Sequence, residues 1–279
     1  MRKTIIATVF VALVSTMTYA QQFRIATYNI RQKNTHDTGN MWDERKEALT
    51  NLIKFHQFEI FGTQEGFNDQ LVDMERLLPG FKYIGVGRDD GAEKGEYSAI
   101  FYDTKRFEVS KNGTFWLSAT DISKPNKGWD AALPRICTWG IFKDKKTKKQ
   151  FILMNTHFDH VGVAARKESA KLMMAKAKEF AGNLPLIITG DFNVSETDEA
   201  YFTLANSGIV ADSYSKIDSR YAPNSTFNGF GKSIKPAERI DHIFITPQFS
   251  VKKYGILTDT YVGKYPSDHF PVMVDLVQN

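Results

Sequence analysis

Short apolar segments with the composition of β-strands recur from residue 23 to residue 276, and only four segments show the periodicity of amphipathic helices. The predicted strands are residues 23–30, 59–64, 81–86, 98–102, 107–117, 136–142, 150–157, 186–189, 239–246, 251–258 and 272–276, and the predicted helices are residues 44–56, 69–78, 164–180 and 198–205. Each sheet has an apolar face that another element must cover, so many strands with few helices favour two sheets packed face to face, with helices outside. No composition break, repeat or linker divides the chain, which indicates one α/β domain.

The first 20 residues are typical of a secretory signal peptide. A basic pair at residues 2–3 precedes an apolar run at 5–14, and residues 18–20 fit the small-residue pattern of a cleavage site. The apolar run is shorter than the roughly 20 residues that a membrane-spanning helix needs. We therefore expect a signal peptide at 1–20, a domain at 21–279, and an exported protein, periplasmic or secreted, without a stable membrane anchor.

The net charge argues against a non-specific duplex-binding protein, and the glycine pattern argues against one class of nucleotide-binding fold. The formal net charge is +4, and two of these charges leave with the basic pair of the signal peptide. So small a net charge does not indicate the basic face that drives non-specific duplex binding. No glycine-rich phosphate-binding loop follows a predicted strand, so the nucleotide-binding folds built on such a loop are unsupported.

Three runs of acid, amide and imidazole side chains end or follow predicted strands. They are residues 155–160 (Asn-Thr-His-Phe-Asp-His), 189–193 (Thr-Gly-Asp-Phe-Asn) and 266–271 (Pro-Ser-Asp-His-Phe-Pro). Enzymes built on sheets place their chemistry where strands give way to loops. Two histidines with aspartates suit phosphoryl transfer to water, because that reaction needs a carboxylate-bound metal, a base for the water and donors for the phosphate oxygens.

Two further polar residues at strand ends suit a metal site. Glu65 closes an apolar strand, where a carboxylate is costly unless it meets a cation or a set of donors. Asn29 ends the first strand, and its amide can bind the same ion through oxygen or through a water. Oxygen ligands of this kind suit a hard divalent ion such as Mg²⁺. Taken singly, each residue also fits an ordinary turn or cap.

Alternation along an extended segment predicts which side chains around the two histidines point the same way. Asp191 and Asn193 are two positions apart and share a face of an extended segment, with the phenylalanine between them packed behind. The alternative is a turn capped by the aspartate. Asp241 suits the orientation of a catalytic imidazole. His160 and His242 alternate to the other side of the chain, so we expect surface or packing roles for both.

Taken in order, these motifs resemble those of the endonuclease/exonuclease/phosphatase superfamily, the fold of DNase I, exonuclease III and the magnesium-dependent sphingomyelinases. The matching motifs are Thr27-Tyr28-Asn29, Gln64-Glu65, Asn155-Thr156-His157, Gly190-Asp191-Phe192-Asn193, Arg239-Ile240-Asp241 and Ser267-Asp268-His269. The helix and loop after the first histidine look most like bacterial members near the CCR4-type deadenylases. The resemblance implies a four-layered α/β sandwich, in which two packed mixed β-sheets are flanked by helices and the site lies at one end of the sheets.

The resemblance also implies catalytic roles for individual residues. Asp191 matches the residue that positions the attacking water, with Asn193 next to it. His157 and His269 match the two histidines at the scissile phosphate. Asp241 matches the carboxylate that supports the second of them.

Metal and substrate contacts follow from the same comparison and from neighbouring residues. Glu65 matches the principal metal ligand, with Asn29 and Asp268 beside it, and the expected ion is Mg²⁺, with Mn²⁺ as an alternative. Candidate substrate-binding residues are Glu96, Arg135 and Arg166. Glu96 resembles an acidic residue that lies near the first histidine or the phosphate. Arg135 precedes a strand that leads to the cleft and could bind phosphate there. Arg166 is either a substrate contact or a charge on a helix surface.

These observations predict a metal-dependent phosphoesterase that hydrolyses a phosphodiester bond. It is a nuclease, acting as an endonuclease or an exonuclease, or a related phosphodiesterase. A secreted sphingomyelinase or phospholipase C and a sugar- or inositol-phosphate phosphatase remain alternatives, as does a secreted binding protein that has lost catalysis. The expected partner is a phosphoester substrate, with nucleic acid among the candidates, and the expected oligomeric state is a monomer.

Overall fold

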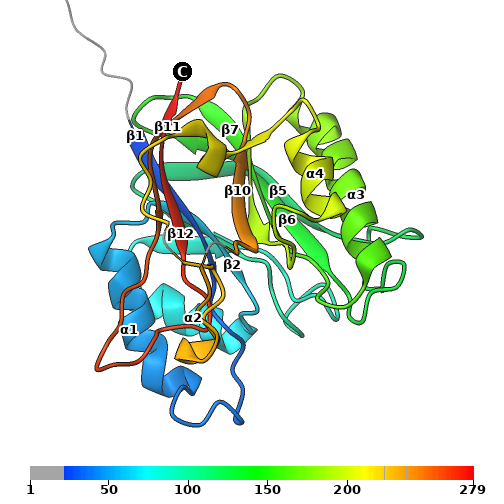
Figure 1. Ribbon diagram of the computed structural model, residues 1–279. Coiled ribbons are helices and arrows are strands. Elements are labelled where there is room, and N and C mark those ends of the chain that lie inside the picture. The colour runs from blue at the N-terminus through cyan, green and yellow to red at the C-terminus, as the bar shows by residue number, and fades with distance from the viewer. Residues whose placement is uncertain (1–21, 223, 237) are drawn as a thin grey trace, which may run out of the picture.

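Two six-stranded mixed sheets form the centre of the molecule (Figure 1). The computed structural model describes residues 22–222, 224–236 and 238–279, so the expected signal peptide lies outside the described residues. The strands of the first sheet, in spatial order, are β11 (Phe249–Ile256), β12 (Val272–Gln278), β1 (Gln22–Asn29), β2 (Ile60–Gln64), β4 (Ile100–Asp103) and β3 (Phe81–Ile84). Those of the second are β5 (Phe107–Trp116), β6 (Ile136–Asp144), β7 (Gln150–His157), β8 (Leu186–Asp191), β10 (Asp241–Ile245) and β9 (Ala211–Asp212).

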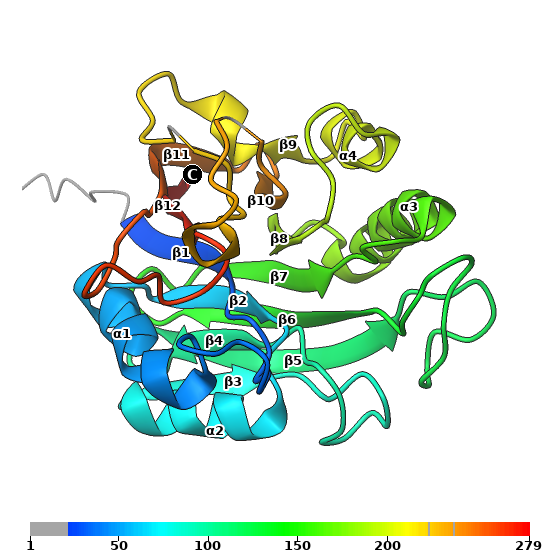
Figure 2. The same cartoon turned by 60° about the horizontal axis from the view of Figure 1, so that its bottom comes forward.

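Helices cover the outer face of each sheet, and Figure 2 shows the two pairs on opposite sides of the molecule. The helices are α1 (Trp42–Phe55), α2 (Asn68–Leu77), α3 (Val163–Ala181) and α4 (Glu199–Ala205). On the first sheet, Leu49 and Met74 belong to a core cluster that includes Phe61 of β2. On the second sheet, Met173 of α3 and Leu204 of α4 are fully buried in another cluster. The molecule is therefore the four-layered α/β sandwich predicted from the sequence.

An apolar core between the sheets holds them face to face. Phe23 of β1 stacks on Phe151 of β7 with ring centroids 5.3 Å apart, and Ile25 and Ile187 belong to the same buried cluster. Alternation along β1 sends Phe23 and Ile25 into this core, while Tyr28 joins the core beneath the helices. Burial of each large apolar side chain contributes about 1.5–3 kcal/mol, so this layer stabilises the pairing of the sheets.

Strand directions bring the polar strand ends to one edge of the sandwich. β1 runs parallel to β2, with Asn29 opposite Gln64, and β7 runs parallel to β8, with His157 opposite Asp191. The carboxyl ends of each parallel pair therefore meet at one edge. β10 is antiparallel to β8 and begins there, with Asp241 opposite Asp191. β12 is antiparallel to β1 and also begins at this edge, so the residues that precede it arrive beside the others.

The predicted strands and helices all form, with ends that differ by a few residues. Between α4 and β10 the chain also contains the short strand β9 and two 3₁₀ turns, η1 (Ser213–Lys216) and η2 (Gly229–Gly231). Two residues are too few to produce a periodic pattern, so β9 has no signal in the sequence. Among the described residues, no helix combines the length and the hydropathy needed to cross a membrane.

Candidate active site

A cavity of about 570 Å³ opens at the edge where the polar strand ends meet. Its lining includes most of the predicted site residues, namely Glu65, Glu96, Arg135, His157, Asp191, Asn193, Asp268 and His269. Asn29 and Asp241 are fully buried and contact these residues from behind. Residues far apart in the sequence thus form one site.

Glu65 and Asn29 form the part of the site that the sequence assigns to a metal. Asn29 Nδ2 donates to Glu65 Oε1 and to Asp191 Oδ2, each over 2.9 Å, while the amide oxygen of Asn29 accepts from the backbone N–H of Arg31. Through these bonds Asn29 orients two carboxylates. Burial raises the pKa of Glu65, but the bond from Asn29 and the charge of His269 bring it below its ordinary value. Glu65 is therefore ionised and suited to a cation.

Asp268 lies across from Glu65, and Arg31 lies beside both. Arg31 Nη1 is 3.6 Å from Glu65 Oε2, and its Nε is 3.7 Å from Asp268 Oδ2. Burial and the charge of Glu65 raise the pKa of Asp268 to about 6, against the opposing charges of His269 and Arg31. Two carboxylates facing one cavity fit a hard divalent cation, which prefers oxygen ligands. Arg31 carried no distinguishing sequence signal, because its role depends on partners distant in the chain.

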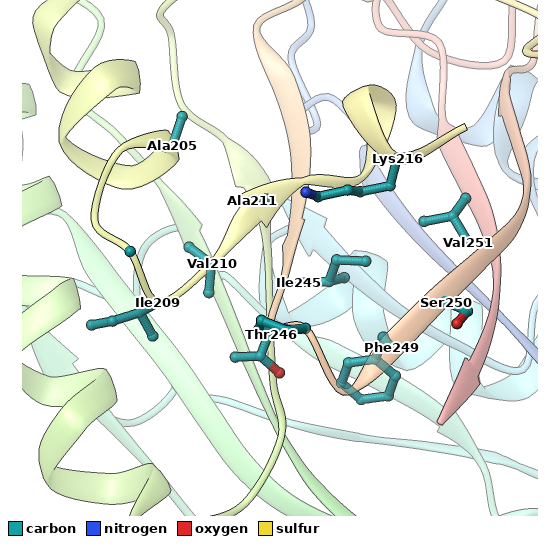
Figure 3. Close-up of a pocket in the computed structure, with 12 residues that line it drawn as sticks. Ala205, Ile209, Val210, Ala211, Lys216, Ile245, Thr246, Phe249, Ser250 and Val251 are labelled. Carbon is teal, nitrogen blue, oxygen red and sulfur yellow. The ribbon is translucent and has the colours of Figure 1, made fainter. Parts of the chain in front are cut away.

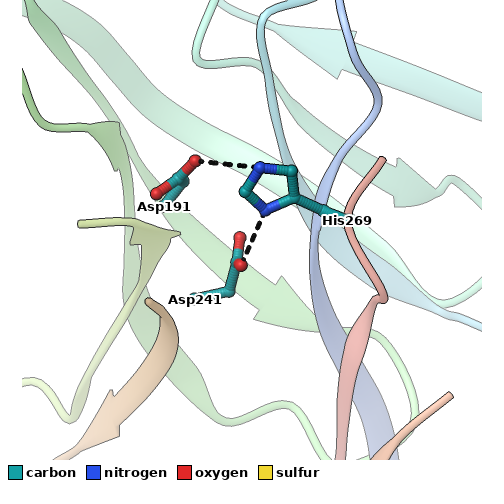
Figure 4. A group of neighbouring side chains, drawn as sticks. All are labelled: Asp191, Asp241 and His269. Atoms are coloured by element: carbon teal, nitrogen blue, oxygen red, sulfur yellow. Dashed lines mark hydrogen bonds and ion pairs between the residues drawn. The ribbon is translucent and has the colours of Figure 1, made fainter. Parts of the chain in front are cut away.

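Asp191, Asp241 and His269 form a buried cluster (Figure 4). His269 Nδ1 donates to Asp241 Oδ2 over 2.9 Å, and His269 Nε2 lies 3.7 Å from Asp191 Oδ2. Burial lowers the pKa of His269, but the two carboxylates raise it well above its ordinary value, so the ring is protonated. Burial and the charge of Asp241 raise the pKa of Asp191 to about 7. One ligand atom from each of the three lies within 4.8 Å of the others, a spacing that could also hold a metal ion.

His157 is held in a different protonation state from His269. Its Nε2 accepts from Asn193 Nδ2 over 3.0 Å, and its Nδ1 lies 3.8 Å from Glu96 Oε2. Burial and the charge of Arg135 lower the pKa of His157 well below its ordinary value, so this ring is neutral. Glu96 therefore lies near the first histidine, as the resemblance implied. The cavity contains one neutral and one charged imidazole.

The segment from Asp191 to Asn193 is a turn, and the expectation of extended chain was wrong. The backbone N–H of Asn193 donates to Asp191 Oδ1 over 2.9 Å, and Asn193 has φ 51°. An aspartate capping its own turn in this way permits the left-handed conformation. Both polar side chains still reach the cavity, and Phe192 packs behind them against Phe158, with ring centroids 5.0 Å apart. The turn therefore directs both polar side chains to the cavity, as we expected from alternation along an extended segment.

Arg135 lines the cavity as expected, but the residues that hold it were not predicted. Arg135 Nε donates to Asp159 Oδ2 over 3.1 Å, and its Nη2 donates to His160 Nδ1 over 2.9 Å. His160 is exposed, which agrees with the expected surface position, and it also lines the cavity. His242 does pack, because it is fully buried and its Nε2 donates to the carbonyl of Val194. Asp159 follows a strand end in the same run as His157, which is the signal that could have identified it.

Two other arginines differ from the sequence analysis. Arg166 is not among the residues that line the cavity, and its Nη1 donates to the carbonyl of Asp159. This position agrees better with the alternative of a charge on the helix surface than with a substrate contact. Arg88, which the sequence did not single out, is buried and donates to both oxygens of Glu96, over 2.7 and 2.9 Å. A pair of N–H donors on one carboxylate fixes its plane, so Arg88 orients Glu96 beside His157.

A second cavity, of about 560 Å³, lies away from these residues between β9, β10 and the start of β11 (Figure 3). Its lining is mostly aliphatic and includes Ile209, Val210, Ile245 and Val251, with Lys216 at one side. Neither a carboxylate nor an imidazole is among the described residues that line it. The chemistry of the candidate active site has no counterpart in this cavity.

Comparisons with known proteins agree with this geometry. A solved structure from Bacteroides thetaiotaomicron, described as a mannosyl-6-phosphatase, shares 50% sequence identity, covers 91% of this chain and 99% of its own, and has a TM-score of 0.89. A family protein from Bacteroides vulgatus shares 41% identity over 93% of this chain and 100% of its own, also with a TM-score of 0.89. The human Nocturnin catalytic domain shares the fold at 19% identity, over 92% of this chain and 94% of its own, with a TM-score of 0.73. The sequence pattern of the endonuclease/exonuclease/phosphatase family matches residues 26–269, and the chain therefore belongs to this family.

Proposed function

We propose that this protein is a metal-assisted phosphatase that hydrolyses the phosphomonoester of a sugar. The observation that carries the proposal is the 50% identity, over 91% of the chain, with a protein described as a mannosyl-6-phosphatase. A sugar phosphatase was one of the alternatives from the sequence, behind a nuclease or other phosphodiesterase. A solved structure of TDP2 from D. rerio, in complex with a single-stranded DNA product, is 16% identical to this chain. A likeness at that level concerns the fold alone. The family assignment supports a phosphoester hydrolase in either case.

The shape and lining of the cavity support a small substrate with one charged end. Arg31, Arg135 and His269 supply positive charge, and Leu133 and Phe227 add apolar surface to the same lining. A cavity of about 570 Å³ is within the usual range for small-molecule sites. A sugar phosphate has an anionic group and a ring with both polar and apolar faces, which matches this division.

The chain's own residues then have distinct parts in hydrolysis. Glu65 and Asp268 would hold the divalent cation, which supplies charge stabilisation for the phosphoryl oxygens and the leaving oxygen. Asp191, with a pKa raised to about 7, is suited to hold and deprotonate the attacking water near neutral pH. Protonated His269 donates toward a phosphoryl oxygen. Asn193 fixes the ring of neutral His157, since its two N–H groups donate to His157 Nε2 and to the carbonyl of Phe158.

A substrate panel tests this function. The purified protein, with Mg²⁺, is assayed on mannose 6-phosphate, glucose 6-phosphate, an inositol phosphate, single-stranded RNA, duplex DNA and sphingomyelin. We expect release of inorganic phosphate from a sugar phosphate at a kcat/KM at least tenfold above that on any diester, and loss of this activity in His269→Ala. Preferential cleavage of RNA, DNA or sphingomyelin would overturn the proposal in favour of a phosphodiesterase. Binding without turnover, with no effect of Mg²⁺ on thermal stability, would favour an inactive binding protein.

We also propose that the protein is exported as a monomer after removal of the first 20 residues. Support comes from the basic pair, apolar run and small residues of that segment. Intact mass and N-terminal sequence of the protein recovered from a bacterial periplasm or medium test the cleavage, with Gln21 as the expected first residue. Light scattering of the same sample tests the oligomeric state.

A further inference from the structure

The cavity of the candidate active site has a buried, charged floor and an exposed rim. Asp191 and His269 on the floor are 1% and 5% exposed, whereas Leu133 and Phe227, which line the same cavity at its rim, are 38% and 36% exposed. Hydrolysis requires the phosphorus atom to reach the water that the proposed mechanism assigns to Asp191, so the phosphoryl group occupies the floor. The sugar is bonded to that group and therefore extends toward the rim.

His160 supplies a polar group at this rim. Its side chain is exposed and lines the cavity. Its Nδ1 accepts from Nη2 of Arg135 over 2.9 Å, and Arg135 is buried. The two nitrogens of an imidazole ring point away from each other, so Nε2 is directed away from the buried guanidinium and toward the exposed side. No residue in the described part of the chain forms a hydrogen bond with Nε2.

Arg135 determines which nitrogen of His160 carries the proton. A guanidinium can only donate hydrogen bonds, and an imidazole nitrogen accepts a hydrogen bond only when it carries no proton. Nδ1 is therefore unprotonated while the bond from Arg135 is present, and the proton of the ring is on Nε2. The ring thus presents a neutral N–H group at the rim, which is a suitable donor to the oxygen of an uncharged hydroxyl.

The loops around this donor are held together by Asp159, the residue directly before His160. The buried carboxylate of Asp159 accepts from Arg135 Nε over 3.1 Å. It also accepts from four backbone N–H groups, those of Ala132, Leu133, Val161 and Gly162. These bonds join the loop before β6 to the loop before α3. The donor is therefore held in place before a substrate arrives, which reduces the entropy lost on binding.

We propose that His160 Nε2 donates to a hydroxyl of the sugar, with Arg135 as the positioning residue that sets its tautomer. The inference rests on the proposed function, and it adds a residue by which the site distinguishes a sugar phosphate from other phosphomonoesters. The hydroxyl takes no part in the bonds made and broken at phosphorus. Because it is bound equally before and during the reaction, the contact acts on KM more than on kcat.

Hexose 6-phosphates that each lack one hydroxyl test the contact. In the wild type with Mg²⁺, removal of the recognised hydroxyl should lower kcat/KM about 3- to 10-fold, the effect of one neutral hydrogen bond. His160→Ala should cause a loss of the same size on mannose 6-phosphate, mainly through KM, and no further loss on the analogue that lacks this hydroxyl. A loss that is the same on every analogue would overturn the proposal.

Ethyl phosphate separates this contact from a general effect on the site, because it has the same CH₂–O–P linkage and no hydroxyl. His160→Ala should lose less activity on ethyl phosphate than on mannose 6-phosphate. Equal losses on the two substrates would show that His160 serves only to hold Arg135, and would overturn the proposal. His36→Ala is the matched control and should keep wild-type kinetics, because His36 is exposed and is not among the residues that line the cavity.

Two replacements at the same position test the donor itself. His160→Gln keeps an acceptor for Arg135 and an N–H donor, so it should recover most of the wild-type kcat/KM on mannose 6-phosphate. His160→Phe keeps a ring without nitrogen atoms and should behave as His160→Ala does. If His160→Gln were as impaired as His160→Phe, the donor would not be the group that matters.

Nitrogen-15 NMR of the labelled protein gives a readout that is independent of turnover. At mildly alkaline pH the ring of His160, assigned by comparison with His160→Gln, should carry its proton on Nε2. Arg135→Met has no donor for Nδ1 and should allow both tautomers. A proton on Nδ1 in the wild type would contradict the assignment.

The sugar panel and the His160 variants fail in distinguishable ways. Failure of the wild type on every sugar phosphate would refute the proposed function and the hydroxyl contact together. Turnover of mannose 6-phosphate that is indifferent to His160→Ala would refute the contact and leave the proposed function in place.

Discussion

His269 and His157 lie in one cavity, but their surroundings give them opposite charge. Two carboxylates raise the pKa of His269, whereas burial and the charge of Arg135 lower that of His157. A charged ring can donate from both nitrogens, and a neutral ring donates from one and accepts at the other. The two histidines therefore cannot exchange tasks, although the sequence presents them in similar settings.

Asp241→Asn tests the charge on His269. The change removes the carboxylate that accepts from Nδ1 over 2.9 Å, so the ring loses both its orientation and its main source of protonation. We expect kcat on a sugar phosphate to fall by about 10² or more, the usual cost of losing such a group. Asp275→Asn is the control, because Asp275 is also buried and pairs with Arg24 on the far part of the sheet. A kcat within threefold of wild type, in a folded protein, would contradict the assignment.

Glu65→Gln tests the metal site without relying on turnover. Any ligand that binds the folded state alone raises the melting temperature by mass action. We expect Mg²⁺ to stabilise the wild type by several degrees and to leave Glu65→Gln unchanged, because the amide lacks the charge that a hard cation needs. Glu47→Gln, an exposed position on α1, should respond as the wild type does. An equal Mg²⁺ shift in Glu65→Gln would place the ion elsewhere.

Residues of the site divide into those that the sequence could identify and those that it could not. Asp191, His157 and His269 stand in short motifs at strand ends, so pattern alone exposes them. Arg88 acts on Glu96 through contacts that only the fold creates, and a single charged residue in a loop has no distinguishing pattern. The capped turn at Asn193 was given only as the alternative, since a pair of residues two positions apart fits both an extended segment and such a turn.

At the scale of elements, the site depends on where strands stop. The predicted strands and the parallel pairing of β1 with β2 and of β7 with β8 bring four polar ends to one edge. Apolar patterning predicts the strands, but it does not contain their order in a sheet, because any strand with one apolar face can pair with several others. The resemblance of the motifs supplied the four-layered arrangement, and the structure supplies the order of the strands. The short strand β9 pairs with β10, and its Asp212 also accepts from Arg239 Nη1.

Asp212 at the end of β9 should make stability depend on acid pH. Burial opposes its charge, but bonds from His242 and the charge of Arg239 lower its pKa to about 2, from an ordinary value of 3.8. A folded-state pKa below the unfolded value gives stability that is present above about pH 4 and is lost as the pH falls through about 2. We expect Asp212→Asn to lower the free energy of unfolding by about 2 kcal/mol at pH 7, with the difference shrinking toward pH 2.

Urea unfolding followed by circular dichroism at pH 7 and at pH 3 measures this difference. Exposed Asp218 provides the control, because Asp218→Asn should change the free energy of unfolding little at either pH. A deficit in Asp212→Asn that is the same size at both pH values would show that the loss comes from packing and not from the charge.

For the molecule as a whole, the site is divided between the two sheets. Glu65 and His269 belong to the first sheet, at the ends of β2 and β12, while Asp191, His157 and Asp241 belong to the second. The 2.9 Å bond from His269 to Asp241 therefore crosses from one sheet to the other. Apolar packing brings the sheets together but is non-directional, so directional contacts are needed to set their relative position.

Asn155 on β7 supplies such contacts. Its Oδ1 accepts from Gln64 Nε2 over 2.8 Å, and its Nδ2 donates to the carbonyl oxygens of Thr63 and Ala99, all on the first-sheet side. The sheets approach so closely here that a Cβ on Gly62 would lie 2.2 Å from Asn155 Oδ1. Both ends of the Asn155 amide have partners, and buried polar contacts of this kind can specify a single arrangement of the elements around them.

Asn155→Leu should therefore affect both stability and catalysis. We expect the free energy of unfolding to fall by about 2–4 kcal/mol, because several buried polar groups lose their partner, and kcat to fall at least about tenfold, because a displacement of one sheet misplaces His269 relative to Asp241. Thr138→Val is the matched control: it removes a buried bond to Thr114 within the second sheet, so it should cost stability and keep kcat. Urea unfolding and kcat measured on the same preparations separate the two effects. If Asn155→Leu lost stability but kept kcat within threefold, the apolar core alone would be sufficient to align the two halves of the site.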